Sequence, residues 1–134
     1  MRILPDTNVL IYDTIEDSER HTDASKILDD AEEIFYAPIV IHEFVWVLLK
    51  FSVDPETVLL KIEEYLWDPR AKYIQEPIST IIGSLKLLKE SKFPARDIND
   101  LMILSLAADH KLTLATFDQK LASFAKKKGV SVIP

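Results

Sequence analysis

Residues 2–10 read RILPDTNVL, a short apolar segment that is followed by Asp6, Thr7 and Asn8. Aspartate, threonine and asparagine are favoured at helix N-termini, where their side-chain oxygens accept hydrogen bonds from free backbone amides. The stretch therefore predicts a strand over Arg2–Pro5 that leads directly into a helix. Units of this kind, repeated along the chain, decide the fold class.

Five short apolar segments are separated by longer stretches in which apolar residues recur at helical spacing. The segments expected to be strands are Arg2–Pro5, Ile34–Ala37, Lys72–Ile74, Leu112–Thr116 and Val130–Ile133. Neighbouring parallel strands need a crossover connection, usually a helix, and the alternation predicts such connections. We therefore expect an α/β fold with a parallel sheet that has helices on both faces.

Prolines and one glycine mark the expected helix boundaries, because proline suits the first turn of a helix and glycine suits its end. The expected helices are His21–Ala31, Pro38 to about Phe51, Glu56–Trp67, Pro77 to near Ser91, Asp97–His110 and Asp118–Lys128, with Gly129 as the C-cap of the last. No repeat or linker divides the sequence. Residues 1–134 are therefore expected to form one domain.

The chain has no cysteine, which excludes disulfides and thiolate metal sites. Any metal must be bound by oxygen ligands or by the three histidines. The longest apolar run, Ala37–Leu49, is interrupted by His42 and Glu43 and is too short to span a bilayer. The first residues also lack the apolar core of a signal peptide. We therefore expect a cytoplasmic protein with no membrane partner.

The net charge of -6 argues against a nucleic-acid binder that works through bulk electrostatics. A carboxylate site contributes negative charge that divalent cations cancel, and this leaves nearby basic residues to contact phosphates. The candidates for phosphate contact are Arg96, Lys86, Lys89 and Lys92, with the run Lys126–Lys128. The lysines also fit ordinary solvated helix faces, and the C-terminal run fits the helix dipole.

Asp6 and Asp118 follow the first and the fourth expected strands. Ligands of open α/β sheets bind beyond the carboxyl ends of the strands, so both residues are candidate site residues. Each also has a structural explanation, because a strand that leads into a helix needs an N-cap.

Glu43 lies within an apolar segment. Its helix neighbours three and four positions away are Ile39, Val40, Trp46 and Val47. An ionised carboxylate in such surroundings needs a cation, a hydrogen-bond network or an opening to solvent. We favour a ligand role for Glu43, and a salt bridge to Lys50 is the main alternative.

Asp97 and Asp100 lie three residues apart at the start of an expected helix. Asp97 fits the N-cap, and Asp100 fits the first turn, where the helix dipole favours negative charge. The residues Leu101–Leu106 are apolar apart from one serine, so this turn enters the protein body. We expect Asp100 to be a ligand and Asp97 to be the cap.

Four carboxylates are thus expected in one site: Asp6, Glu43, Asp100 and Asp118. Clustered acids repel one another and need compensation by a cation. Oxygen-only ligands select hard ions such as Mg²⁺ or Mn²⁺. Such an ion positions and activates a water and neutralises phosphodiester oxygens, which favours a metal-dependent nuclease.

Four motifs, in this order, resemble those of PIN-domain nucleases, and most closely those of VapC-type toxins of toxin–antitoxin pairs. They are DTNVL at 6–10, HEF at 42–44, NDLMILSLA at 99–107 and TFD at 116–118. The resemblance implies a PIN-like three-layer α/β/α sandwich whose central five-stranded parallel sheet has the order 3-2-1-4-5.

The same resemblance implies a homodimer with a cognate antitoxin that cleaves RNA endonucleolytically with Mg²⁺ or Mn²⁺. Asp6, Glu43, Asp100 and Asp118 would be its metal-site acids. Asn8 and Thr116 would be supporting polar groups, and Asp97 is an extra acid beside the third motif.

Two other classes of protein compete with this interpretation. One is a non-catalytic PIN-like scaffold or RNA-binding protein, against which the presence of all four acids argues. The other is a phosphotransfer enzyme or receiver domain. Haloacid-dehalogenase phosphatases need a second aspartate two residues after the first, and that position holds Asn8.

Overall fold

The computed structural model describes residues 1–134 and contains one five-stranded sheet. The strands are β1 (Arg2–Pro5), β2 (Glu33–Tyr36), β3 (Ala71–Tyr73), β4 (Thr113–Ala115) and β5 (Val132–Ile133). Their order in the sheet is β3-β2-β1-β4-β5, and every neighbouring pair is parallel. The predicted parallel sheet and its strand order are confirmed.

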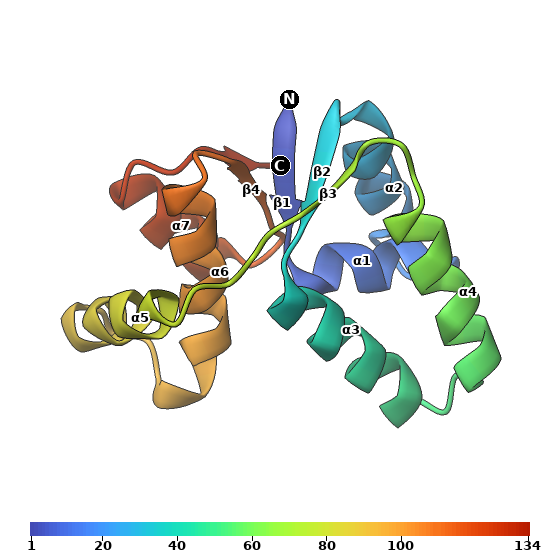
Figure 1. Cartoon of the computed structure of the whole chain (residues 1–134), viewed down its shortest axis with the longest axis horizontal. Coiled ribbons are helices and arrows are strands. Elements are labelled where there is room, and N and C mark those ends of the chain that lie inside the picture. The colour runs from blue at the N-terminus through green and yellow to red at the C-terminus, as the bar shows by residue number, and fades with distance from the viewer.

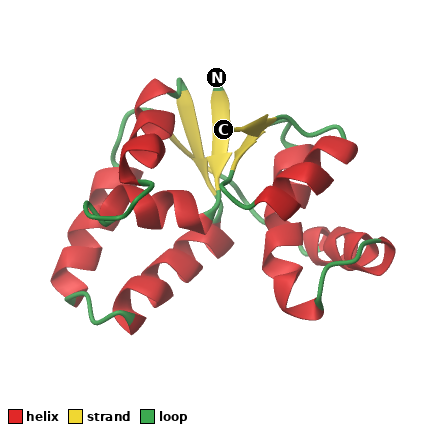
Figure 2. Cartoon of the chain, turned by 180° about the vertical axis from the view of Figure 1, so that it is seen from behind, coloured by secondary structure: helices red, strands yellow, loops and turns green.

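Seven α-helices connect and cover the strands. They are α1 (Thr7–Thr14), α2 (His21–Asp30), α3 (Pro38–Lys50), α4 (Pro55–Leu66), α5 (Ser79–Glu90), α6 (Ile98–Asp109) and α7 (Gln119–Lys127). A short 3₁₀ turn, η1 (Ala95–Asp97), precedes α6. In Figure 1 the sheet lies in the middle, with α1 to α4 on one side and α5 to α7 on the other. Figure 2 shows the same three layers from behind.

The core lies between the sheet and both helix layers. In the central strands, Ile3, Leu4 and Leu114 are fully buried. Helix α6 is buried over most of its length, because Leu101 and the run 103–107 lie between the sheet and α5. The apolar run that the sequence shows after Asp100 therefore enters the protein body as expected.

Helix α5 begins later than predicted. It starts at Ser79 rather than Pro77, after an extended segment that crosses in front of the sheet from β3 (Figure 1). The side chain of Glu76 in this segment accepts a hydrogen bond of 2.7 Å from the backbone amide of Ile39, at the start of α3. This bond holds the segment on the first helix layer before the chain reaches the second.

Gly129 has a φ of 79°, in the left-handed region that glycine adopts without steric cost. It follows the last turn of α7, as predicted for a C-cap glycine. No helix of the fold is long and apolar enough to cross a membrane.

Candidate active site

Asp6 occupies the point where the central strand β1 ends and α1 begins. It is the N-cap of α1, and its Oδ1 accepts a hydrogen bond of 3.2 Å from the Val9 amide. Its Oδ2 accepts a hydrogen bond from the Thr116 hydroxyl. The residue is only 6% exposed. Burial raises the pKa of Asp6 to about 6, against these two bonds, and the charges of Asp118 and Glu43 raise it further.

Thr116 links the ends of two neighbouring strands. Pro5 in β1 pairs with Ala115 in β4, so the residues that follow the two strands lie side by side. The Thr116 hydroxyl donates to Asp6, and its oxygen accepts a hydrogen bond of 3.0 Å from the Asp118 amide. The polar group expected to support the acids thus contacts one carboxylate and the backbone of another.

Asp118 is the N-cap of α7. Its Oδ1 accepts hydrogen bonds of 3.0 and 3.1 Å from the amides of Lys120 and Leu121. Capping and clustering are therefore not alternatives for Asp6 and Asp118. Both cap a helix, and both lie at the carboxyl edge of the sheet.

Asp100 lies in the first turn of α6, is half-buried, and has neither a hydrogen-bond nor an ion-pair partner for its carboxylate. Burial raises the pKa of Asp100 to about 7. The charges of Asp118, Asp6, Asp97 and Glu43 contribute in the same direction, in that order. Five acids from four parts of the sequence are thus near enough to repel one another at one place in the fold.

Glu43 lies on α3 and lines an open groove of about 460 Å³. The other residues that line it are Ile39, His42, Trp46 and Val47 from α3, and Asn99 from α6. The alternative salt bridge to Lys50 is wrong. The Lys50 ammonium instead lies 4.9 Å from the centroid of the Trp46 ring. The sequence left a cation, a hydrogen-bond network or an opening to solvent as ways to accommodate the charge of Glu43. The structure shows the opening to solvent, because Glu43 lines an open groove.

Asp97 does not cap α6 with its side chain, and that prediction is wrong. The residue stands at the N-cap position, but its φ of -91° and ψ of 14° continue the 3₁₀ turn η1. A capping side chain normally needs an extended N-cap backbone, so the Asp97 carboxylate does not reach the first amides of the helix. It lies instead 4.0 Å from the Lys120 ammonium.

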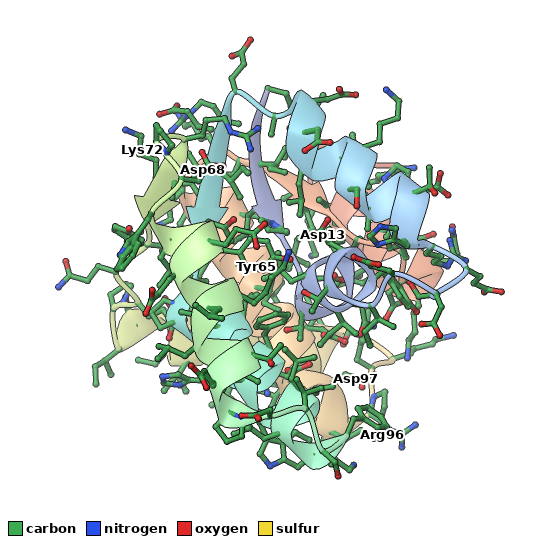
Figure 3. The ribbon with its side chains drawn as sticks, turned by 90° about the vertical axis from the view of Figure 1, so that its right-hand side faces the viewer. Asp13, Tyr65, Asp68, Lys72, Arg96 and Asp97 are labelled. Atoms are coloured by element: carbon green, nitrogen blue, oxygen red, sulfur yellow. The ribbon has the colours of Figure 1, made fainter.

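The expected phosphate contacts and one supporting residue lie at the surface. Arg96, Lys86, Lys89 and Lys92 are exposed and form no ion pair within the chain. Figure 3 shows Arg96 beside Asp97 at one edge of the molecule, far from Lys72 and Asp68. Asn8 is also exposed and forms no side-chain hydrogen bond, so its supporting role stays a prediction.

The donor chemistry of this site fits a hard divalent cation, because every donor is a carboxylate oxygen. Burial, and after it the charges of the neighbouring acids, raises the pKa values of Asp6 and Asp100. The side chains do not converge into a finished ligand set, since no group of three or more acids or histidines is placed to hold one metal ion. Oxygens of Asp6 and Asp118 are held by Thr116 and by backbone amides instead. The fit therefore rests on donor type and charge.

Sequence reasoning assigned no role to Trp46, His42 or Asn99, which line the groove beside Glu43. A signal for Trp46 was present, because position 46 follows position 43 at helical spacing and lies on the same side of α3. Asn99 had no such signal. Its position opposite α3 depends on how α6 packs in three dimensions.

The chain was compared with known families and solved structures. Residues 3–127 match the PIN domain family. None of the curated protein sequences matches the chain. Solved structures from several organisms share the fold at low sequence identity.

The toxin VapC20 of Mycobacterium tuberculosis, described as cleaving the sarcin-ricin loop, matches with a TM-score of 0.78 at 11% identity, covering 91% of this chain and 94% of that one. VapBC-1 of nontypeable Haemophilus influenzae matches with a TM-score of 0.72 at 19% identity, covering 99% and 97%. A toxin-antitoxin complex from Klebsiella pneumoniae matches with a TM-score of 0.69 at 21% identity, covering 98% and 96%.

Proposed function

The chain belongs to the PIN-domain family, and from this membership and the acidic site we propose that it is a metal-dependent endoribonuclease, the toxin of a VapBC-type pair. The observation that carries the proposal is Asp100, a half-buried carboxylate with no partner in the chain and a pKa raised to about 7. A buried charge without compensation is strongly disfavoured. A divalent cation supplies that compensation.

Asp6, Glu43, Asp100 and Asp118 would hold Mg²⁺ or Mn²⁺, which when bound positions a water and neutralises charge on the phosphodiester and on the leaving oxygen. Thr116 orients Asp6, and its hydrogen bond favours the ionised form that a metal ligand needs. Arg96, with Lys86, Lys89 and Lys92, is proposed to contact substrate phosphates, since none of the four is engaged in an ion pair.

The test is cleavage of a mixed RNA pool with Mg²⁺, with Mn²⁺ or with EDTA. We expect cleavage with either metal, none with EDTA, and a loss of at least about 100-fold for Asp100→Asn, the range for removing one group that stabilises the transition state. Asp109→Asn is the matched control, because Asp109 is an exposed acid at the other end of α6. Equal loss in both variants, or cleavage that persists in EDTA, contradicts the proposal.

The competing interpretation is a PIN-like scaffold that binds RNA or protein without cleaving. The same assay separates the two, because a scaffold leaves the RNA pool intact under every metal condition. Phosphate release from a small phosphoester would instead favour the phosphotransfer interpretation.

The proposed partners are RNA, an antitoxin and a second copy of the chain, in the cytoplasm. The similarity in fold to a toxin-antitoxin complex supports the antitoxin. Helix α5 supports a protein partner, because it buries the small polar residues Thr80 and Ser84 while large aliphatic residues at its start and along it face solvent. These are Ile78, Ile81, Ile82 and Leu85, between 47% and 81% exposed. Light scattering on the purified chain measures whether it is a dimer.

A further inference from the structure

The groove beside Glu43 has an aromatic wall that the hydrolytic chemistry does not use. Trp46 is 61% exposed and lines this groove, whereas Phe44 on the same helix is fully buried. The groove is continuous with the candidate active site, since Glu43 belongs to both. His42 adds a second ring, and Asn99, from α6, adds an amide that both donates and accepts hydrogen bonds.

Three different side chains follow one another along this side of α3. Glu43, Trp46 and Lys50 are three and four residues apart, so they lie on one side of the helix. At a rise of about 1.5 Å per residue, they span roughly 10 Å along its axis. The Lys50 ammonium lies over the Trp46 ring, 4.9 Å from its centroid, so the cation covers one face of the ring. Along the helix the order is therefore the Glu43 carboxylate, the Trp46 ring and the Lys50 ammonium.

We propose that this side of α3, with Trp46 as its centre, is a subsite for one nucleotide of single-stranded RNA next to the cleaved bond. The base stacks on the face of Trp46 that Lys50 does not cover, and the adjoining phosphate contacts Lys50. The inference rests on the proposed ribonuclease function and deepens it, because it names the form of RNA that reaches the acids.

Stacking of a base on Trp46 requires the RNA to be single-stranded at this subsite. Bases in a duplex are already stacked on their neighbours, whereas an unpaired base offers its face to a protein ring. Stacking on an aromatic side chain tolerates any base, because every base has a π-face. Lys50 supplies positive charge in a chain whose net charge is -6, and so brings the phosphate to a site that is otherwise acidic.

Tryptophan fluorescence tests the contact directly. The chain has two tryptophans, and Trp67 lies at the end of α4, 76% exposed. Trp67→Phe therefore leaves Trp46 as the sole reporter. In EDTA, without cleavage, we expect a short mixed-sequence single-stranded RNA to quench this emission, and a duplex of the same sequence to quench it much less.

Affinity measurements in EDTA test whether the contact contributes to binding. Trp46→Ala should weaken binding of the single strand by about 5- to 100-fold, and Trp46→Phe should restore most of it. Lys50→Gln should lower the slope of log affinity against log salt concentration by about 0.7, the value for one phosphate of a single strand. Trp67→Ala is the matched control and should bind as the wild type does.

Two outcomes overturn the inference. One is unchanged affinity in Trp46→Ala; the other is a Trp46 emission that responds to protein concentration and not to RNA, which assigns this face to a second copy of the chain. Cleavage of the RNA pool with Mg²⁺ is measured separately. A wild type that cleaves while Trp46→Ala binds normally refutes the subsite and leaves the nuclease function intact.

Discussion

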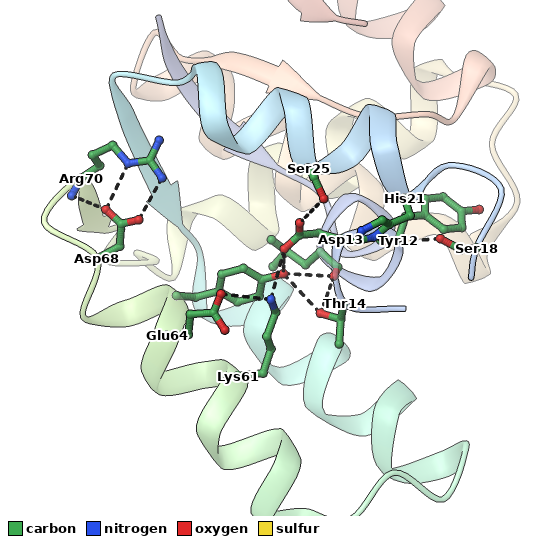
Figure 4. A network of polar contacts seen from close by, with 12 residues as sticks. Tyr12, Asp13, Thr14, Ser18, His21, Ser25, Lys61, Glu64, Asp68 and Arg70 are labelled. Atoms are coloured by element: carbon green, nitrogen blue, oxygen red, sulfur yellow. Dashed lines mark hydrogen bonds and ion pairs between the residues drawn. The ribbon is translucent and has the colours of Figure 1, made fainter. Parts of the chain in front are cut away.

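Two regions of the molecule contain an aspartate that is at least half-buried, and its charge is compensated in one region and uncompensated in the other. Asp13, at the end of α1, is 14% exposed and is surrounded by donors. Tyr65 and Ser25 donate hydrogen bonds to it at 2.6 and 2.7 Å, and the Lys61 ammonium lies at 3.4 Å (Figure 4). Asp100 has no partner at all and faces other acids. The chain compensates the charge of Asp13 with its own donors and leaves the charge of Asp100 uncompensated.

The difference separates acids that the chain neutralises within its own hydrogen-bond networks from acids that it leaves without a counter-ion. The Asp13 network joins α1, α2 and α4, and burial beside Asp13 raises the pKa of Tyr65 far above its ordinary value, so that the hydroxyl remains a donor. Asp68 likewise has a partner within the chain, because its carboxylate lies 2.9 Å from the Arg70 guanidinium. At the carboxyl edge of the sheet, by contrast, Asp6 and Asp100 have no counter-ion, and the charges of neighbouring acids raise their pKa values further.

The largest effect on stability is expected where the chain compensates its own charge. Asp13→Ala should lower the free energy of unfolding by about 3 kcal/mol. It removes the shared acceptor of Tyr65, Ser25 and Lys61, and it leaves Lys61 with only the exposed Glu64 as a partner. Urea denaturation measures this loss, while cleavage per folded molecule should stay unchanged. A loss below about 1 kcal/mol would remove the distinction between the two regions.

A medium effect is expected from pH on the metal-free protein. The pKa values of Asp6 and Asp100 rise from 3.8 to about 6 and about 7 on folding. The folded chain therefore binds more protons than the unfolded chain between about pH 4 and pH 7. Across this window, rising pH should lower the free energy of unfolding by about 2 kcal/mol. This is well below the roughly 7 kcal/mol that two independent, fully buried groups would give, because solvent screens the half-buried Asp100 and the two acids titrate together.

Urea denaturation in EDTA at several pH values measures that slope. Asp100→Asn should flatten it, because the variant lacks one raised group and removes a repulsive charge from Asp6. Asp109→Asn should leave the slope unchanged. A stability that rises with pH across the same window would contradict the repulsion inferred here.

The smallest effect separates the two roles of Asp118. Asp118→Ala should cost about 1 kcal/mol of metal-free stability, because the amides of Lys120 and Leu121 lose their acceptor. Asp118→Asn keeps a capping oxygen and should be nearly neutral. Thermal unfolding with and without Mg²⁺ then reports binding, and both variants should lose most of the Mg²⁺-induced rise in melting temperature. A full rise in Asp118→Asn would limit Asp118 to capping.

The features that could be predicted from the sequence are those that depend on residues close together along the chain. The strand–Asp6–helix unit and the Gly129 cap follow from local patterns, and both are confirmed. The role of Asp97 was missed because a 3₁₀ turn, rather than an extended residue, precedes α6. The Asp13 network was missed because Tyr65 lies 52 residues away along the chain. In the groove beside Glu43, the helical spacing of Trp46 was a local signal, whereas the position of Asn99 depends on the packing of α6 beside α3 and left none.

The hydrogen bond from Thr116 to Asp6 joins residues 110 positions apart. Contacts of such long sequence separation are slow to form, because a large loop must close before they contribute. A folding intermediate in which β1 has paired with β2 but not yet with β4 therefore has Asp6 without Thr116, Asp118 or the α6 acid. The acidic cluster therefore assembles only when β4 has joined β1 and the two halves of the sheet have met.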